Sequence, residues 1–191
     1  MLDHALEGGF AQAPQQAAAG FRAALSALAR PGRIETIEGA TGPAPMSVAA
    51  ATLVLTLVDA ETPIYLGAGH DSPAVRQWIA FHTGAPIVPA ARAHEAMFAL
   101  GHWEDLMPLG QFFHGTAEYP DRSATLIVEV EAHAPPTHHL TGPGIEISAE
   151  MRLPSGIDAR RDMAFPLGVD FYFSAGHHIS ALPRSTRVED L

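Results

Sequence analysis

Apolar residues recur at spacings of three and four along the first part of the chain. Between Pro14 and the pair Pro31-Gly32, the positions that repeat in this way are Ala17, Ala18, Phe21, Ala24, Leu25 and Leu28. The spacing places them on one face of a helix, since Pro suits a first helical turn and Pro-Gly ends a helix. We therefore expect an amphipathic first helix, followed by a short strand in residues 33–38, where polar and apolar side chains alternate.

Two further helices are expected in the first half of the chain. Residues 48–58 are too uniformly apolar to show a period, so a buried helix and a buried strand both fit; length and alanine content favour a helix capped by Ser47. After a turn and a short strand at 64–66, Asp71 or Ser72 can cap another helix that begins near Pro73. Its apolar face would carry Val75, Trp78, Ile79 and His82.

Strands dominate the second half of the pattern. We expect one at 96–100 and a stronger one at 124–130, with Leu126, Val128 and Val130 on one face and Thr125, Ile127 and Glu129 on the other. Two hairpins are expected, 137–141 with 145–147 around Gly142-Pro143-Gly144, and 169–173 with 178–182, ended by Pro183. Residues 153–163 are the most loop-like interior stretch. The mixture predicts an α/β protein, and without a repeat or a long linker we expect one domain over residues 1–191.

The amino-acid composition limits the classes of molecule that the protein is expected to bind. Of the 191 residues, 47% are hydrophobic, enough for an ordinary core, and the formal net charge is −10. That charge repels nucleic acid and anionic lipid, so protein partners are more plausible than DNA. No apolar run approaches the roughly 20 residues of a membrane span, and no secretory leader is evident. We expect a cytoplasmic protein.

Two residue types are missing. The eleven basic residues are all Arg, so the chain has no Lys, and it has no Cys. Schiff-base catalysis, covalent anchoring of pyridoxal phosphate and the P-loop amine are thereby excluded, as are thiolate nucleophiles and cysteine-rich metal sites. Any metal chemistry would rest on His and carboxylates.

Eleven histidines invite a metal hypothesis that their spacing discourages. Adjacent histidines on a strand point to opposite faces, and no His-x-x-x-His motif falls on an expected helix. We predict no metal site, although His114 and His133 would be nearest to a presenting strand. For His82 we favour a structural role at a helix end, where an imidazole can donate to a last-turn carbonyl.

Other candidate chemistry is sparse. No Gly-x-Ser-x-Gly turn is present, and 142–144 is a weak phosphate loop because Pro143 has no amide to donate. The best candidate for anion binding is Arg184 with Thr186, which offer a guanidinium group and a hydroxyl just after an expected strand. The competing interpretation is a C-terminal tail whose arginines pair with local acids or with a partner protein.

An ordered set of segments resembles a known family. The segments lie at 21–22, 30–32, 55–57, 59, 62–63, 81–83, 85–86, 115–116, 124–127, 140–142, 144–145, 165–170, 183–184, 186 and 188–189. Each is short, but their order and spacing resemble the PhnH family, a core component of the phosphonate carbon-phosphorus (C-P) lyase system. The likeness is loosest at 88–113 and 149–163.

The resemblance implies an α/β fold with a central mixed sheet flanked by helices, related to pyridoxal-phosphate-dependent transferases but without the cofactor. It implies a noncatalytic core subunit of the C-P lyase complex. With the core subunits G, I and J and an ATP-binding-cassette-type protein, such a subunit is required to form ribose 1-phosphonate 5-triphosphate from a nucleoside triphosphate and an alkylphosphonate. The resemblance supplies no catalytic residue, and no cofactor is expected. Subunits G, I and J are the expected partners, with a homodimer when the chain is isolated.

Two rival functions remain open from the residues. In the first, Arg184 and Thr186 contribute a phosphate- or nucleotide-binding wall to the transferase site. In the second, histidines and carboxylates form a metallohydrolase. A metal analysis of untagged protein distinguishes the metallohydrolase from the phosphate-binding wall and from the noncatalytic core subunit.

Overall fold

The computed structural model describes residues 6–131, 135–163 and 165–191, without the side chains of 161 and 162. Its α-helices are α1 (Ala13–Ala29), α2 (Val48–Leu57) and α3 (Pro73–Thr83). Its strands are β1 (Glu35–Thr36), β2 (Ile64–Leu66), β3 (Ile87–Val88), β4 (Phe98–His102), β5 (Thr125–Glu129), β6 (His138–Thr141), β7 (Ala149–Met151), β8 (Asp170–Ala175), β9 (His178–Leu182) and β10 (Arg187–Asp190). Short 3-10 helices are η2 (Ala90–Glu95), η3 (Trp103–Leu106), η4 (Leu109–Gln111), η5 (Pro120–Arg122) and η6 (Ile157–Asp162).

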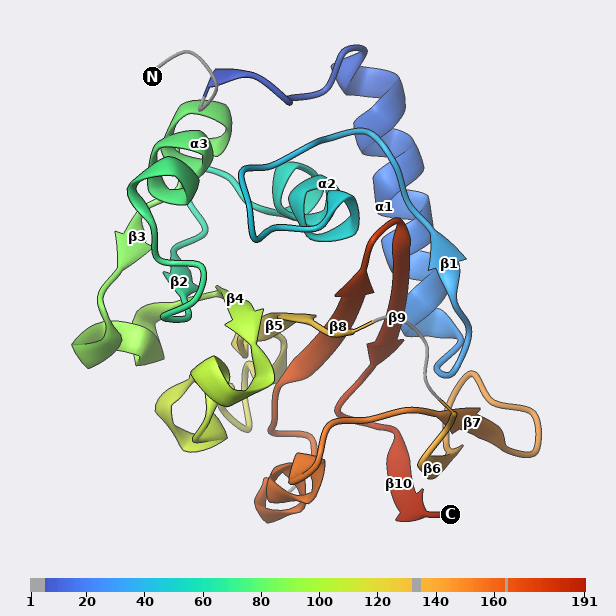
Figure 1. The fold of residues 1–191 in the computed structure, drawn as a ribbon. Helices are drawn as coiled ribbons and strands as arrows, with labels where there is room; N and C mark the ends of the chain where they lie inside the picture. The colour runs from blue at the N-terminus through green and yellow to red at the C-terminus, as the bar shows by residue number, and fades with distance from the viewer. Residues whose placement is uncertain (1–5, 132–134, 164) are drawn as a thin grey trace.

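The main sheet is mixed and has seven strands in the order β1-β9-β8-β5-β4-β2-β3 (Figure 1). Strands β3, β2, β4, β5 and β8 are parallel, and β9 turns back antiparallel to β8 before pairing with β1. The carboxyl ends of the parallel strands therefore share one edge. That edge is where ligands bind in open α/β sheets.

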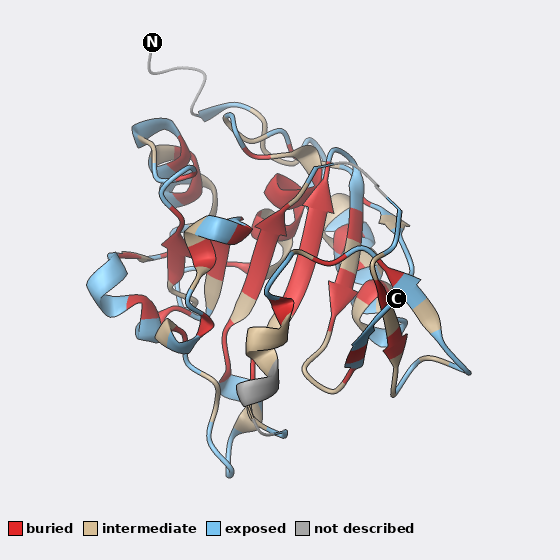
Figure 2. Cartoon of the chain, turned by 60° about the horizontal axis from the view of Figure 1, so that its bottom comes forward, coloured by how far each residue is buried: buried red, intermediate tan, exposed pale blue. Residues whose placement is uncertain are grey.

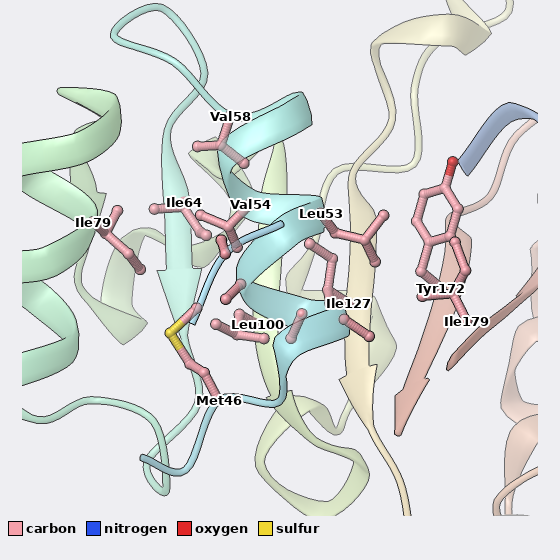
Figure 3. Packing of buried hydrophobic residues seen from close by; sticks show 14 of the residues in the cluster. Met46, Leu53, Val54, Val58, Ile64, Ile79, Leu100, Ile127, Tyr172 and Ile179 are labelled. Atoms are coloured by element: carbon pink, nitrogen blue, oxygen red, sulfur yellow. The ribbon is translucent and has the colours of Figure 1, made fainter. Parts of the chain in front are cut away.

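The three α-helices lie together on one face of this sheet (Figure 1). Ser47 caps α2 by accepting a hydrogen bond from the Ala50 amide at 3.0 Å, and the helix is buried along most of its length. Leu53 and Val54 of α2 pack toward β4, β5 and β9, as Figure 3 shows with Leu100, Ile127 and Ile179. An apolar helix surrounded on all sides needs no amphipathic period, which explains the uniform pattern of residues 48–57.

A second core covers the opposite face. Leu126, Val128, Phe171 and Phe173 of the central strands pack there against the 3-10 helices and the loops between strands. A three-stranded antiparallel sheet, β10-β6-β7, closes this side near the C-terminus. Both faces of the central strands are thus buried, and Figure 2 shows these strands as the most buried part of the molecule.

Several expectations needed correction. The hairpin arm expected at 145–147 is wrong, because β6 pairs instead with β7, four residues downstream, and with β10. The strand expected at 96–100 begins two residues later, and the stretch 153–163 contains η6. The expected α/β fold with a mixed sheet and flanking helices is confirmed; the α-helices lie on one face, and short 3-10 helices and the small sheet cover the other. None of the helices in the described part of the chain combines the length and hydropathy needed to cross a bilayer.

Candidate functional site

A pocket of about 840 Å³ opens at the carboxyl edge of the main sheet. Its walls come from the ends of β4 and β5, from β9 with the end of β8, and from β7 of the small sheet. Pro45 and Ser47, just before α2, also line it, as do residues 136–138 and 152–155 and the residues Gly32 and Ile34. Its volume suits a small organic molecule, and its position is the one where α/β proteins place ligands.

Glu129, the last residue of β5, is the buried acid of this pocket. Only 7% of the residue is exposed. Its Oε1 accepts a hydrogen bond from the Ser47 amide at 2.6 Å, and its Oε2 accepts one from the Ser174 hydroxyl at 3.1 Å. Burial raises the pKa of the Glu129 carboxyl, although these hydrogen bonds and His102 act in the opposite direction. The carboxylate is therefore held in place by two elements of the fold.

The same carboxylate occupies the amino end of α2. Free amides at a helix amino end are the usual phosphate site of such folds. Here the Ser47 amide donates to Glu129, the Ala49 amide to the carbonyl of Gly176, and the Ala50 amide to the Ser47 hydroxyl. These three amides are satisfied within the described residues, so they are not available to an external anion.

A buried histidine lies behind the rim of the pocket. His70 follows β2 and is fully buried, and its ring lies 5.0 Å from that of His102, an exposed residue of the pocket wall. Neither ring nitrogen of His70 has a hydrogen-bond partner among the described residues. Burial, assisted by His102 and opposed by Asp105, lowers the pKa of His70 to about 4. His70 is therefore uncharged at neutral pH.

Close backbone packing brings these residues together. A Cβ on Gly67 would lie 2.6 Å from the Cβ of Asp105, which only a glycine avoids without a shift of the chain. Asp105 in turn accepts a hydrogen bond from the Gly69 amide at 3.0 Å. The loop after β2 is thereby held against η3, and this contact positions His70 beside His102.

The predicted anion residues lie at the other edge of the sheet. Because β9 runs antiparallel, its carboxyl end meets the amino end of β8, and Arg184 pairs there with Asp170 through a 2.5 Å contact. Its guanidinium also donates to the Pro120 carbonyl. Thr186 is buried, and its hydroxyl has no hydrogen-bond partner among the described residues. Anion binding by Arg184 and Thr186 stays a prediction.

The histidine predictions have mixed outcomes. His82 lies in the last turn of α3, but its ring packs against Trp78 at 4.8 Å and Phe81 at 4.9 Å, and its Nε2 has no hydrogen-bond partner within the described residues. His114 lies with its Nε2 3.2 Å from the Leu109 carbonyl, whereas His133 falls outside the described residues. No group of three or more potential ligands for a metal was found in the described part of the chain.

The site residues Glu129, His102 and His70 were missed from sequence. Alternation placed Glu129 on one face of its strand, beside Thr125 and Ile127, without saying that this face is buried too. A usable signal existed, since a lone acid that ends an apolar strand lies at the carboxyl edge if the strand is parallel. Recognising that parallel pairing requires the topology.

Fold and pocket together define an α/β protein with a small-molecule-sized pocket at the carboxyl edge of a mixed sheet. The chain belongs to the PhnH family, bacterial phosphonate metabolism proteins, whose family model matches residues 8–189.

Two curated relatives agree with this assignment. The chain is 37% identical over 191 residues to the alpha-D-ribose 1-methylphosphonate 5-triphosphate synthase subunit PhnH of Rhizobium meliloti (strain 1021), covering 95% of this chain and 94% of that protein. It is 29% identical over 185 residues to the putative C-P lyase subunit protein HtxG of Stutzerimonas stutzeri, covering 93% and 87%. The family expected from the sequence is confirmed.

Proposed function

We propose that the protein is the PhnH component of a synthase that forms alpha-D-ribose 1-methylphosphonate 5-triphosphate for carbon-phosphorus bond cleavage. Membership of the PhnH family and 37% identity to a subunit of that name support this function. The protein would act in the cytoplasm, where nucleoside triphosphates are available. It would be a noncatalytic subunit, and its partners would carry out the chemistry. We propose further that the chain folds as one domain and that its fold is related to that of pyridoxal-phosphate-dependent transferases.

An apolar stripe on the outer face of α1 is the observation that supports a role in assembly with other proteins. Ala18, Phe21 and Leu25 follow one another at spacings of three and four, and all three are exposed. Phe21 is 53% exposed and Leu25 55%, although both are large apolar residues. Side chains of this kind gathered on one helix face suit burial against another protein. We name these three residues the α1 stripe.

Subunits G, I and J are the proposed partners, and a second copy of the chain would cover the α1 stripe when they are absent. Size-exclusion chromatography with light scattering tests both statements. The expected result is a dimer of the isolated chain and a stoichiometric complex after mixing with purified G, I and J. A monomer at high concentration whose elution is unchanged by every partner would sink the proposal.

A variant locates the interface. The double change Phe21→Glu and Leu25→Glu places two charges on the stripe, and it should abolish the dimer or the complex because buried unpaired charge opposes association. Ile147→Glu is the matched control, since Ile147 is 85% exposed in a loop outside α1. Equal assembly of the two variants would place the interface elsewhere.

A second candidate function is a phosphate- or nucleotide-binding wall formed by Arg184 and Thr186. It is favoured by the buried Thr186 hydroxyl, which lacks a partner among the described residues. In the assembled complex, Arg184→Ala should weaken nucleotide binding without loosening assembly. Because Arg184 is paired with Asp170, the isosteric change Thr186→Val is the cleaner companion. Unchanged nucleotide affinity in both variants would reject this role.

A further inference from the structure

The pocket at the carboxyl edge presents one buried carboxylate, that of Glu129. Glu129 accepts hydrogen bonds from the Ser47 amide and the Ser174 hydroxyl, and the Ser47 side chain is a further donor to it; these donors are neutral. The charge of His102, an exposed residue of the pocket wall, favours the ionised form of Glu129 and acts to lower its pKa. A buried carboxylate is normally compensated by a cation or a further donor, and each of its oxygens can accept more than one hydrogen bond. Glu129 lines the pocket, so a ligand there could donate further hydrogen bonds to it.

The walls of the pocket continue the same charge. Glu104, Glu131 and Glu150 line it with Glu129, whereas Arg152 is its one arginine among the described lining residues; three histidines, His102, His138 and His178, line it as well. The three rim acids are exposed, so their charges are screened but not cancelled. An anionic ligand would have to overcome this field, and a cationic ligand would be drawn in by it.

The pocket also lacks the usual binding site for an anion. In folds of this class the free amides at a helix amino end bind phosphate. At α2 those amides donate to Glu129, Gly176 and Ser47. The carboxylate thus stands where a phosphate group would otherwise bind, and it reverses the charge preference of the position.

We propose that this pocket binds a small organic cation, an amine or amidine on an apolar body, with Glu129 as the carboxylate that receives its N–H groups. The volume of about 840 Å³ fits a ligand of that size. Phe173 and Ile179 supply apolar wall for the body of the ligand. An amidine and a carboxylate share two parallel hydrogen bonds, which gives this class its selectivity. The site is a property of the isolated chain and does not depend on the proposed assembly.

The test uses two probes that match in shape and differ in charge. Benzamidine and benzoate are titrated separately into the full-length chain and followed by protein NMR or calorimetry, with inorganic phosphate as a third probe. We expect saturable binding of benzamidine alone. Binding of benzoate or phosphate with equal or higher affinity, or no binding of benzamidine, would overturn the proposal.

Variants locate the binding. Glu129→Gln keeps an oxygen acceptor for the Ser47 amide but removes the charge, and it should weaken benzamidine binding by about tenfold or more. Glu118→Gln, the same change at an exposed glutamate outside the pocket, should leave it unaltered. Ser180→Phe places a large side chain on the β9 wall of the pocket and should abolish binding, so the proposal can still be tested if Glu129→Gln fails to fold. Undiminished binding to folded Ser180→Phe would refute the site.

Discussion

The buried polar side chains of this protein differ in their hydrogen-bond partners although all of them are shielded from solvent. Glu129 accepts hydrogen bonds from Ser47 and Ser174 and lines a pocket. The ring nitrogens of His70 and the hydroxyl of Thr186 have no hydrogen-bond partner in the part of the chain that the structure describes. Burial disfavours the charged form of each ionisable group, so it raises the pKa of the Glu129 acid and lowers that of the His70 imidazole.

His70 should make the stability of the protein depend on pH between about 6.5 and 4. Its pKa is near 6.5 in the unfolded chain and about 4 in the folded one, so the unfolded state binds more protons in this window and stability falls as the pH falls. The contribution of His70 is on the order of 2 kcal/mol across the window. Urea unfolding of the wild type and of His70→Leu from pH 7 to pH 4 measures it.

The comparison needs a control for the other acids and histidines. His94→Leu removes an imidazole that is largely exposed and should retain the full pH slope of the wild type. If His70→Leu and wild type keep parallel slopes, His70 does not titrate in this window.

Thr186→Val should leave the isolated chain as stable as the wild type or more stable. The change replaces a buried hydroxyl that has no partner in the described residues with a methyl group of similar size. Removing an unsatisfied polar group relieves a desolvation penalty of about 1 kcal/mol or more. Thermal unfolding measures the difference, and a loss of several degrees would mean that the hydroxyl makes a stabilising bond.

Among the elements, the helices differ in what their ends do. Both α2 and α3 begin with a serine whose hydroxyl accepts an amide hydrogen bond, at 3.0 Å from Ala50 and 3.2 Å from Val75. The amino end of α2 also holds Glu129 through the Ser47 backbone, whereas that of α3 does not line this pocket. One local signal in the sequence thus marks both a purely structural helix start and one that shapes a site.

Loss of either cap should destabilise the chain to a similar extent, about 1 kcal/mol. Ser47→Ala and Ser72→Ala each remove one hydroxyl acceptor, and chemical denaturation measures the cost. Ser47→Ala keeps the Ser47 amide as a donor to Glu129, so it should retain benzamidine binding. A loss of several kcal/mol at Ser47 alone would indicate that the hydroxyl supports more than the helix end.

Across the whole molecule, one sheet separates two apolar cores. Trp78 belongs to the core under the α-helices and Trp103 to the core on the other face. These are the two tryptophans of the chain, so each face carries its own fluorescent reporter. The central strands contribute side chains to both cores, which couples the two faces physically.

The two faces should unfold together if the chain is one domain. Trp78→Phe leaves a reporter on one face and Trp103→Phe leaves a reporter on the other. In each variant, the tryptophan fluorescence should follow the same denaturation midpoint as the loss of secondary structure by circular dichroism. Two separated transitions within one variant would divide the chain into independent units.

Local patterns along the chain were enough to predict most helices and strands and the family. The α1 and α3 patterns, the Ser47 and Ser72 caps and the second hairpin could be predicted because 3.6-residue periodicity, capping side chains and turn residues act between near neighbours. Absent lysine excluded Schiff-base chemistry without any structure. These signals do not depend on which distant segments meet.

Long-range strand pairing determined which edge of the sheet forms a pocket and which residues line it, and it is visible only in the folded chain. Residues 145–147 had a strand-like pattern, yet β6 found its partners in β7 and β10. Likewise, the antiparallel course of β9 carried Arg184 to the edge opposite Glu129. Strand direction and pairing depend on contacts between residues far apart in the chain, and the alternation of side chains within one strand carries no record of them.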